Sequence, residues 1–429
     1  MIHTFVKTCN DNGEKTAFII KNKRISFETL LKDVYMMVNL FQKRNIPRGS
    51  RALLFMLPSY EFYVLLFACI YYGINIFVPD SYKDRGRILR MMKENDVKQV
   101  FCNDFTHFLR FVFPKGTEFL NVSKFCQCED APAKANANES LPVLTTFTSG
   151  TTGEPKPIER SVKFLKEQIE TISKNVEIND SSVVFGGLPI YALFIVYSGV
   201  TCFLGGVLRK NQLKKYRVDT VLAPRSLLLN TKGRSDFVRK TYCGGARLYQ
   251  RDVDRLKDLF PAAKHSYIYG ASECALIGIT DLDYYVTHSF AIKDFARGVE
   301  VSLLETDENV VGKIFVRGAS VLTEGRGYVS NDLGYLDAFG LHIVGRSKYS
   351  IAGAYNYLLD DKILSENERV KRGFALVYEG KTYFCYEGKI TKKKADVTYV
   401  KFYKLPMDAK HKTKLDYVKT VALLKKKGL

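Results

Sequence analysis

The chain has 429 residues, of which 46% are hydrophobic and 26% are charged. This is the composition of a globular protein with room for two or three domains, and it excludes a disordered or collagen-like chain. Nine cysteines without regular spacing or a neighbouring histidine argue against a zinc motif, so we expect free thiols in a reducing, cytoplasmic compartment.

The formal net charge is +20, and lysine is most concentrated late in the chain, at 392–394 and 425–427. A solvated basic surface explains this excess, but so does an acidic protein partner, an anionic cosubstrate, a membrane surface or a nucleic acid. No nucleic-acid-binding module accompanies the charge, so we expect no nucleic-acid partner.

The N-terminal third predicts alternating helices and strands. Ser26 is a candidate N-cap for a helix with one apolar face, 51–57 and 74–78 are candidate strands, and 60–72 is a candidate buried helix. This alternation favours a parallel α/β sheet.

Further apolar runs at 183–188, 220–223, 266–269 and 312–316 are candidate strands, and 131–140 is a polar connector. The stretches 62–78 and 183–208 are apolar, but a polar residue or several glycines interrupt them, so we expect no transmembrane segment. From about residue 347 the pattern becomes lysine-rich and alternating, which indicates a small α+β domain.

The segment 148–156 follows a β-prone run at 141–147 and is rich in glycine and hydroxyl side chains. Glycines let backbone N–H groups converge on an anion, hydroxyls add donors, and lysine adds a mobile positive charge. The segment predicts a phosphate-binding loop that is not a Walker loop, although polar surface turns share this composition. The residues concerned are Thr148, Ser149, Gly150, Thr151, Thr152, Gly153 and Lys156.

Two more glycine turns follow β-like runs. One is Tyr269-Gly270-Ala271-Ser272-Glu273, and the other is Cys243-Gly244-Gly245-Ala246-Arg247. An aromatic ring at a strand end can stack on a nucleobase, and a carboxylate such as Glu273 can hold a magnesium ion that bridges phosphates. Taken alone, each pattern also fits an ordinary strand end.

Two later patterns carry charge. The carboxylate of Asp332 suits the two hydroxyls of a ribose, and Arg346 offers a planar donor fork to the same nucleotide. A surface ion pair between two loops is the alternative. Near the C-terminus, Lys412 and Lys414 lie in a run where a mobile lysine could neutralise charge developing on a transferred phosphate, although the whole tail is rich in lysine.

The order and spacing of these motifs resemble the adenylate-forming superfamily of acyl-CoA synthetases, nonribosomal peptide synthetase adenylation domains and luciferases, over nearly the whole chain. The resemblance implies an α/β fold. Residues 1–346 would form a large ATP- and acyl-binding domain of several subdomains, with mostly parallel sheets flanked by helices. Residues 347–429 would form a small mobile α+β lid domain that carries the catalytic lysine.

The resemblance also implies a role for each motif. The loop from Thr148 to Lys156 would hold the β- and γ-phosphates of ATP, and Ser272 and Glu273 would serve the phosphates and Mg²⁺. Asp332 would hold the ribose beside Arg346, and Lys348 would lie at the hinge. Lys414 would be the catalytic lysine, with Lys412 as the alternative. The adenine site would comprise Gly245, Ala246, Arg247, Tyr269, Gly270 and Ala271.

The stretches 188–194 and 408–414 show a narrower likeness, to the olefin-pathway β-lactone synthetases. Two departures from the acyl-CoA synthetases concern the acyl site and the lid: Ala192 stands where many of them have histidine, and the C-terminal domain is short. The acyl chain is expected near an apolar wall, which favours a fatty or aryl acid over an amino acid. That wall comprises Tyr191, Phe194, Ile195 and Gly244.

We therefore expect a ligase that uses ATP and Mg²⁺ to convert a carboxylic acid to an acyl-adenylate, then transfers the acyl group to CoA or to an acidic acyl carrier protein. The first alternative is a β-lactone synthetase acting on a β-hydroxy acid. Alternatives from other classes are a degenerate nucleotide-binding interaction protein and a basic protein that binds nucleic acid or a membrane surface.

Overall fold

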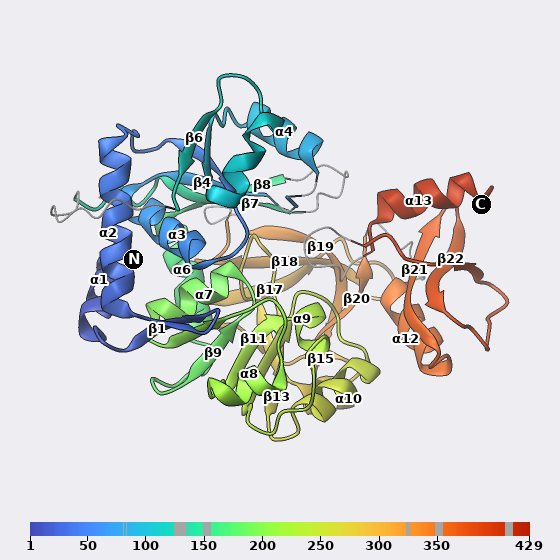
Figure 1. Ribbon diagram of the computed structural model, residues 1–429. Coiled ribbons are helices and arrows are strands. Elements are labelled where there is room, and N and C mark those ends of the chain that lie inside the picture. Colours follow the sequence, from blue (N-terminus) through green and yellow to red (C-terminus); the bar gives the residue numbers. More distant parts are fainter. Residues whose placement is uncertain are drawn as a thin grey trace. The chain divides into compact units, whose positions relative to one another are not determined.

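Figure 1 shows the computed structural model of the chain, which describes residues 1–79, 81–82, 84–123, 134–136, 138–148, 156–322, 327–347, 355–407 and 415–429. The described residues fall into two compact units, one ending at Ala223 and the other running from Pro224 to Leu429. Each unit is described by itself. The boundary expected between residues 346 and 347 lies inside the second unit and stays a prediction.

The first unit contains a six-stranded sheet in the order β6-β5-β3-β4-β7-β8. Neighbouring strands are parallel except for β8, which is antiparallel to β7. The strands are β3 (Arg51–Phe55), β4 (Asn75–Val78), β5 (Gln99–Cys102), β6 (Glu118–Asn121), β7 (Pro142–Thr148) and β8 (Lys156–Ser161).

Five further strands of this unit lie in the order β11-β9-β10-β1-β2. All are parallel to their neighbours except β2, which forms a hairpin with β1. The strands are β1 (Thr16–Ile20), β2 (Lys23–Ser26), β9 (Val183–Gly186), β10 (Thr201–Leu204) and β11 (Thr220–Pro224). The mostly parallel sheets expected from the sequence are therefore present in this unit.

The helices of the first unit begin and end where local chemistry requires. Ser26 caps α2, because its hydroxyl accepts a hydrogen bond from the Thr29 N–H at 3.1 Å, as predicted. Helix α3 ends at Gly73, which adopts the left-handed conformation with φ of 94°. The helices are α1 (Ile2–Asp11), α2 (Phe27–Lys43), α3 (Tyr60–Tyr72), α4 (Arg85–Glu94), α5 (Asp104–His107), α6 (Val162–Ser173), α7 (Pro189–Tyr197), α8 (Lys210–Lys215) and the 3₁₀ helix η1 (Phe108–Val112).

The two apolar stretches are folded into this core. The first divides into α3 and β4, and the second into β9, α7 and β10. Within the described part of the chain, no helix has both the length and the low charge that crossing a bilayer demands.

The second unit begins with four strands in the order β16-β14-β13-β12, of which β12 and β13 are parallel. Five more strands form an antiparallel sheet in the order β15-β20-β19-β18-β17. The strands are β12 (Lys240–Gly244), β13 (Lys264–Tyr269), β14 (Gly278–Asp281), β15 (Ala291–Ile292), β16 (Asp294–Phe295), β17 (Val299–Leu304), β18 (Gly312–Gly318), β19 (Tyr328–Asp337) and β20 (Gly340–Arg346). The unit also contains α9 (Arg225–Leu229), α10 (Gln250–Leu259) and α11 (Leu282–Thr287).

The C-terminal part of this unit has its own three-stranded sheet, β21-β22-β23, as the alternating pattern predicted. Helices α12 and α13 accompany the sheet in the orange-to-red part of Figure 1. The elements are α12 (Asn356–Glu366), β21 (Val370–Tyr378), β22 (Lys381–Gly388), β23 (Thr398–Lys401) and α13 (Tyr417–Lys426).

The cysteines of the described chain are free and buried. Burial raises the pKa of the Cys9 and Cys385 thiols to about 12, so they remain protonated near neutral pH. The residues are Cys9, Cys69, Cys102, Cys202, Cys243, Cys274 and Cys385.

Asp360 is a fully buried carboxyl group in α12. It accepts hydrogen bonds from the Ala375 N–H at 2.5 Å and from the Tyr249 hydroxyl at 3.1 Å. Burial raises the pKa of Asp360 well above its ordinary range, which outweighs the opposite effect of the hydrogen bonds. Asp360 therefore joins α12 to β21 and to the start of α10 as a neutral acid.

This raised pKa gives a pH dependence of stability. The unfolded chain releases the Asp360 proton above its ordinary pKa of about 4, whereas the folded chain retains it, so the free energy of unfolding falls as pH rises from that value towards the raised folded pKa. We expect Asp360→Asn to remove this fall, as measured by urea unfolding at several pH values.

The matched control is Asp258→Asn, which removes an exposed carboxylate from α10. Its stability should follow the wild-type pH profile. Parallel profiles for Asp360→Asn and the wild type would contradict a buried neutral acid at residue 360.

Candidate active site

Two glycine turns of the second unit lie at one edge of its sheet. Strands β12 and β13 are parallel, with Gly244 opposite Ile268 in register, so the turns that follow them leave from the same edge. Carboxyl ends of parallel strands are where ligands bind in open α/β sheets. The pairing therefore brings together the two motifs that the sequence offered separately.

Glycine is required in both turns because the backbone approaches too closely for a side chain. A Cβ on Gly244 would lie 2.5 Å from the Ile268 carbonyl oxygen, and a Cβ on Gly270 would lie 1.9 Å from that of Ala275. Gly245 also has a positive φ of 78°. These contacts fix the path of the chain from Tyr269 into the turn that carries Glu273.

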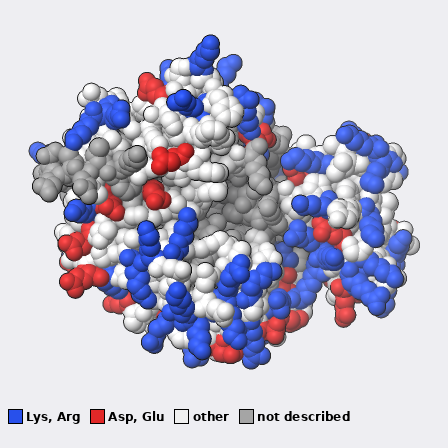
Figure 2. All heavy atoms as spheres, viewed as in Figure 1, with Lys and Arg blue, Asp and Glu red and all other residues white. Residues whose placement is uncertain are grey.

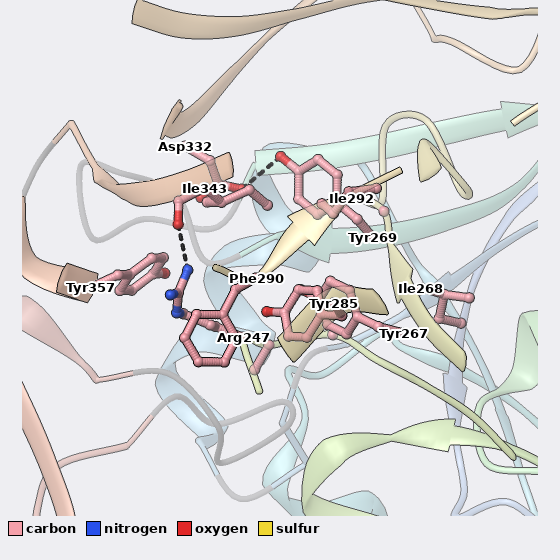
Figure 3. Close-up of a pocket in the computed structure, with 13 residues that line it drawn as sticks. Arg247, Tyr267, Ile268, Tyr269, Tyr285, Phe290, Ile292, Asp332, Ile343 and Tyr357 are labelled. Atoms are coloured by element: carbon pink, nitrogen blue, oxygen red, sulfur yellow. Dashed lines mark hydrogen bonds between the residues drawn. The ribbon is translucent and has the colours of Figure 1, made fainter. Parts of the chain in front are cut away.

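A cavity of about 40 Å³ lies between the two turns and the antiparallel sheet, as Figure 3 shows. At ~10–15 Å³ for each water molecule, it has room for about three waters, which is less than a purine base needs. Its walls are mainly aromatic, with an arginine and a carboxylate. The lining residues are Gly245, Ala246, Arg247, Tyr267, Ile268, Tyr269, Gly270, Tyr285, Phe290, Ile292, Asp332, Ile343 and Tyr357.

Tyr269, Asp332 and Arg346 form a hydrogen-bonded chain at this cavity. The Tyr269 hydroxyl donates to Asp332 Oδ2 at 3.0 Å, and Arg346 Nε lies 3.0 Å from Asp332 Oδ1. Burial, with the Asp332 carboxylate adding to it, raises the pKa of Tyr269, so this hydroxyl remains a donor. Each carboxylate oxygen has a further lone pair with which to accept a ligand hydroxyl.

The alternative of a surface ion pair between two loops does not describe Asp332 and Arg346. They are cross-strand partners in the β19–β20 ladder, and each side chain is 20% exposed. Such a partly buried, register-fixed pair holds its carboxylate in place more firmly than a solvent-exposed loop pair would.

Arg247 extends from the β12 turn towards α12. Its Nη1 donates to the Ile343 carbonyl oxygen at 2.5 Å, and its Nη2 lies 2.5 Å from Asp361 Oδ2. The guanidinium carbon lies 4.6 Å from the Phe290 ring centre and 5.6 Å from that of Tyr357. The side chain is only 6% exposed, and its Nε has no partner among the described residues. The Arg247 guanidinium thus offers an unused donor beside the cavity.

Glu273 is half-buried in the turn after β13, and its carbonyl oxygen accepts a hydrogen bond from the Leu322 N–H at 3.0 Å. The described residues contain no cluster of three or more His, Cys, Asp or Glu that could hold a metal ion. A single carboxylate nevertheless suits Mg²⁺, which is often held by one or two carboxylates together with substrate phosphates. Ala271 and Ser272 lie in the same turn, outside the cavity lining.

Several predicted residues lie elsewhere or outside the described part. Ser149, Gly150, Thr151, Thr152, Gly153, Lys348, Lys412 and Lys414 are outside the described residues. Thr148 ends β7 and is in register with the exposed Lys156, which begins β8. Tyr191, Phe194 and Ile195 lie on α7 of the first unit, where Phe194 and Ile195 are fully buried in the core.

Sequence reasoning missed the other half of the cavity wall. Phe290 follows α11, Tyr285 lies on it, and Tyr357 lies on α12. Asp361, the ionic partner of Arg247, is on α12 too, outside the cavity lining. They belong to segments without a recognisable motif. Only the adjacent pair Asp360-Asp361, two carboxylates in a partly apolar helix, offered a signal of buried ionic contacts.

The sequence model of the family described as "AMP-binding enzyme" matches residues 5–328. The chain belongs to the AMP-binding enzyme family. This confirms the resemblance drawn from the glycine-rich motifs.

Two curated proteins have sequences similar to that of this AMP-binding enzyme. It is 27% identical over 233 residues to the protein of Staphylococcus epidermidis named as a long chain fatty acid-CoA ligase, VraA; the match covers 49% of this chain and 51% of that protein. It is 23% identical over 268 residues to the olefin beta-lactone synthetase of Stenotrophomonas maltophilia, covering 55% and 48%. The chain thus spans about half the length of each of these relatives.

Among solved structures, the fold resembles that of O-succinylbenzoate Coenzyme A Synthetase (MenE) from Bacillus subtilis, in complex with ATP and magnesium ion. The TM-score is 0.83 at 16% identity, covering 97% of this chain and 99% of that chain. This likeness confirms the predicted α/β fold with its small C-terminal domain.

Substitution of Gly270 tests the candidate site, because a Cβ at this residue would make the closest backbone contact in the two turns. We expect Gly270→Ala to lower the free energy of unfolding by about 2 kcal/mol or more, since the added methyl group meets the Ala275 carbonyl oxygen and the backbone must shift. Chemical denaturation measures the loss, and nucleotide affinity should fall with it because Tyr269 and Glu273 flank this turn.

Gly206→Ala is the matched control, because no atom lies within 4 Å of a Cβ built there. Its effect should stay within about 0.5 kcal/mol. Equal stability of the two variants would show that the turn after β13 does not need glycine.

Proposed function

We propose that this AMP-binding enzyme uses ATP to activate a carboxylic acid as an acyl-adenylate and then transfers the acyl group to a thiol. The observation that carries the proposal is the aromatic cavity at the β12 and β13 strand ends, where Tyr269 and Asp332 meet. Its place at the carboxyl end of parallel strands and its ribose-compatible carboxylate both suit a nucleotide. Membership of the family supports the same reaction class.

In this proposal each described residue has one task. Adenine would lie between the 245–247 turn and the Tyr269 ring after the lining side chains move apart, since the cavity of about 40 Å³ is narrow. The Asp332 carboxylate would accept hydrogen bonds from the ribose hydroxyls, while Arg346 holds the carboxylate in place through Oδ1. Glu273 would hold Mg²⁺ with the phosphates, and that ion would neutralise charge on the departing pyrophosphate.

The chemistry requires positioning and charge neutralisation more than a new nucleophile. An oxygen of the acid's carboxylate attacks the α-phosphorus of ATP, the bond from that phosphorus to the bridging oxygen breaks, and pyrophosphate leaves with the electron pair. In the second step a thiol sulfur attacks the acyl carbon, its proton passes to solvent, and AMP leaves. Lys414 is proposed to meet the negative charge that develops in the first step.

A fatty acid is the proposed substrate class, and an aryl acid is the second choice. The name of the Staphylococcus epidermidis relative supports a long-chain acid, and that of the Bacillus subtilis enzyme supports an aryl acid. CoA is the proposed acceptor, with an acidic acyl carrier protein as the alternative for this strongly basic chain.

A second candidate function is supported by one observation, the match to an olefin beta-lactone synthetase over 55% of this chain. In that reaction the substrate's own β-hydroxyl, in place of a thiol, would attack the acyl carbon of the adenylate. The two functions share the first step and differ only in the acceptor.

The deciding experiment is ATP–pyrophosphate exchange over a panel of fatty, aryl, β-hydroxy and amino acids, with mass spectrometry of the products with and without CoA. We expect exchange with fatty or aryl acids and an acyl-CoA product. A β-lactone formed without CoA would establish the second function. ATP binding without exchange on any acid would identify a degenerate nucleotide-binding protein and overturn the proposal.

Lysine variants locate the catalytic side chain in the same assay. Lys414→Ala should lower exchange by about 100-fold or more, the loss typical of one preorganised electrostatic group, while ATP binding remains. Lys412→Ala is the matched control and should retain exchange. If Lys412→Ala loses exchange and Lys414→Ala retains it, the catalytic role belongs to Lys412.

A further inference from the structure

The segment 104–112 of the first unit holds three phenylalanine side chains in solvent. Phe105, Phe108 and Phe111 are 79%, 78% and 71% exposed, among the most exposed apolar side chains of the described chain. They are three residues apart along α5 and η1, and side chains at i and i+3 share a face in both kinds of helix. The ring centres of Phe108 and Phe111 lie 6.4 Å apart. They therefore form one continuous row, called here the Phe ridge.

The Phe ridge faces outward because a different row of the same segment faces the core. Thr106 is buried, and Leu109 and Val112 pack against a cluster that contains Ile88 and Met91 of α4. These three residues are also three apart. The orientation of the Phe ridge thus follows from the packing of the whole segment.

Hydrogen bonds hold the segment at its N-terminal end. Asn103 Oδ1 accepts from the Thr106 N–H at 2.9 Å, and the Thr106 hydroxyl accepts from the Asn103 N–H at 3.0 Å, which is a reciprocal capping box. The Asp104 N–H also donates to the Ser123 hydroxyl at 2.7 Å. An anchored segment cannot turn its rings inward, so their exposure to water persists unless a partner covers them.

Basic side chains flank the Phe ridge. Arg110 lies between two of its rings in sequence and is exposed, Lys115 is exposed just beyond it, and Arg85 Nε donates to the Val112 carbonyl oxygen at 2.8 Å. Figure 2 shows many Lys and Arg side chains at its upper edge, over the elements that Figure 1 labels α4 and β6.

Two nearby carboxylates are already engaged by neutral amides. Asp104 accepts from Asn121 Nδ2 at 2.7 Å, and Glu118 accepts from Gln99 Nε2 at 3.1 Å. Both carboxylates keep their negative charge, but in the described part of the chain neither forms an ion pair with Arg85, Arg110 or Lys115. The face therefore combines large apolar rings with available positive charge.

We propose that the Phe ridge binds this protein to the surface of a membrane that contains anionic lipids. Aromatic rings can enter the boundary between headgroups and acyl chains, while arginine and lysine remain at the level of the lipid phosphates. Rings exposed by more than 70% suit a soft lipid phase, whereas a protein partner would need a matching set of pockets. Under the proposed function, such docking would also deliver a long-chain acid from the phase in which it dissolves.

The test is co-sedimentation of the full chain with vesicles of phosphatidylcholine, alone or mixed with phosphatidylglycerol, without ATP or any acid. We expect binding to the anionic vesicles, weakened by added salt. The triple variant F105S/F108S/F111S should lower the partition coefficient by about 100-fold or more, since burying even one such side chain is worth about tenfold or more.

A charge variant tests the electrostatic part separately. R110E/K115E should lower binding to anionic vesicles by about tenfold or more and leave the weak binding to neutral vesicles unchanged, because each basic residue near the surface contributes about 1 kcal/mol. K381E/K401E has the same change in net charge at exposed positions of the second unit and should bind like the wild type.

Two further controls test whether the loss of vesicle binding is specific to the Phe ridge. Tyr403→Ser removes a fully exposed aromatic side chain elsewhere and should not affect binding. Thermal unfolding of the triple variant, and its pyrophosphate exchange with a short soluble acid, should match the wild type, because these rings leave the core and the candidate site untouched. If the wild type shows no pyrophosphate exchange, the proposed function is overturned, but the vesicle result stands.

Three outcomes would overturn the proposal. The triple variant could bind vesicles as tightly as the wild type. Light scattering could show a wild-type dimer that the triple variant converts to monomer, which would assign the Phe ridge to contact with a second copy. Finally, the wild type could ignore both vesicle types and bind an acidic carrier protein through the Phe ridge.

Discussion

Parallel pairing of β12 with β13 is the constraint on which the candidate site depends. Glycine permits the close approach at this edge: a Cβ at Gly244 would lie 2.5 Å from the Ile268 carbonyl oxygen of the paired strand. In the turn after β13, a Cβ at Gly270 would lie 1.9 Å from the Ala275 carbonyl oxygen. Two turns that are distant in sequence thereby leave one sheet edge together. The Tyr269 ring, the Glu273 carboxylate and the 245–247 backbone are all oriented by this one feature.

Ion pairs and hydrogen bonds between buried polar side chains also fix the arrangement of the second unit. Arg225 forms a bidentate pair with Asp252 at 2.9 Å, Arg247 reaches Asp361, and the Tyr249 hydroxyl bonds to Asp360. The Arg225–Asp252 pair joins α9 to α10. Buried charges are expensive unless paired, so the Arg247–Asp361 pair, with the hydrogen bond to the neutral acid Asp360, specifies one docking of α12 more than it adds net stability. Helix α12 also supplies Tyr357 to the cavity wall. The position of α12 therefore affects how much room the cavity has for a nucleobase.

Local chemistry explains which parts of this structure the sequence could predict. The Ser26 cap and the limits of α3 follow from residues next to one another in the chain, and the glycine motifs report close backbone approach directly. The pairing of β15 with β20 and the contact between Arg247 and Asp361 join residues far apart in sequence, for which no local pattern exists. Likewise, apolar residues three apart at 105–111 suggest a buried helical face, and only the packing of Leu109 and Val112 reveals that this row faces outward.

The burial of the cysteines has a consequence for selectivity. An acyl-adenylate is a mixed anhydride, and any nearby thiolate would intercept it. Cys243 and Cys274 lie close in sequence to the two site turns, yet both are fully buried, and burial raises the pKa of each thiol. Thiolate is the reacting form, so these side chains are chemically silent. Under the proposed function, neither Cys243 nor Cys274 would therefore intercept an acyl-adenylate formed beside these two turns.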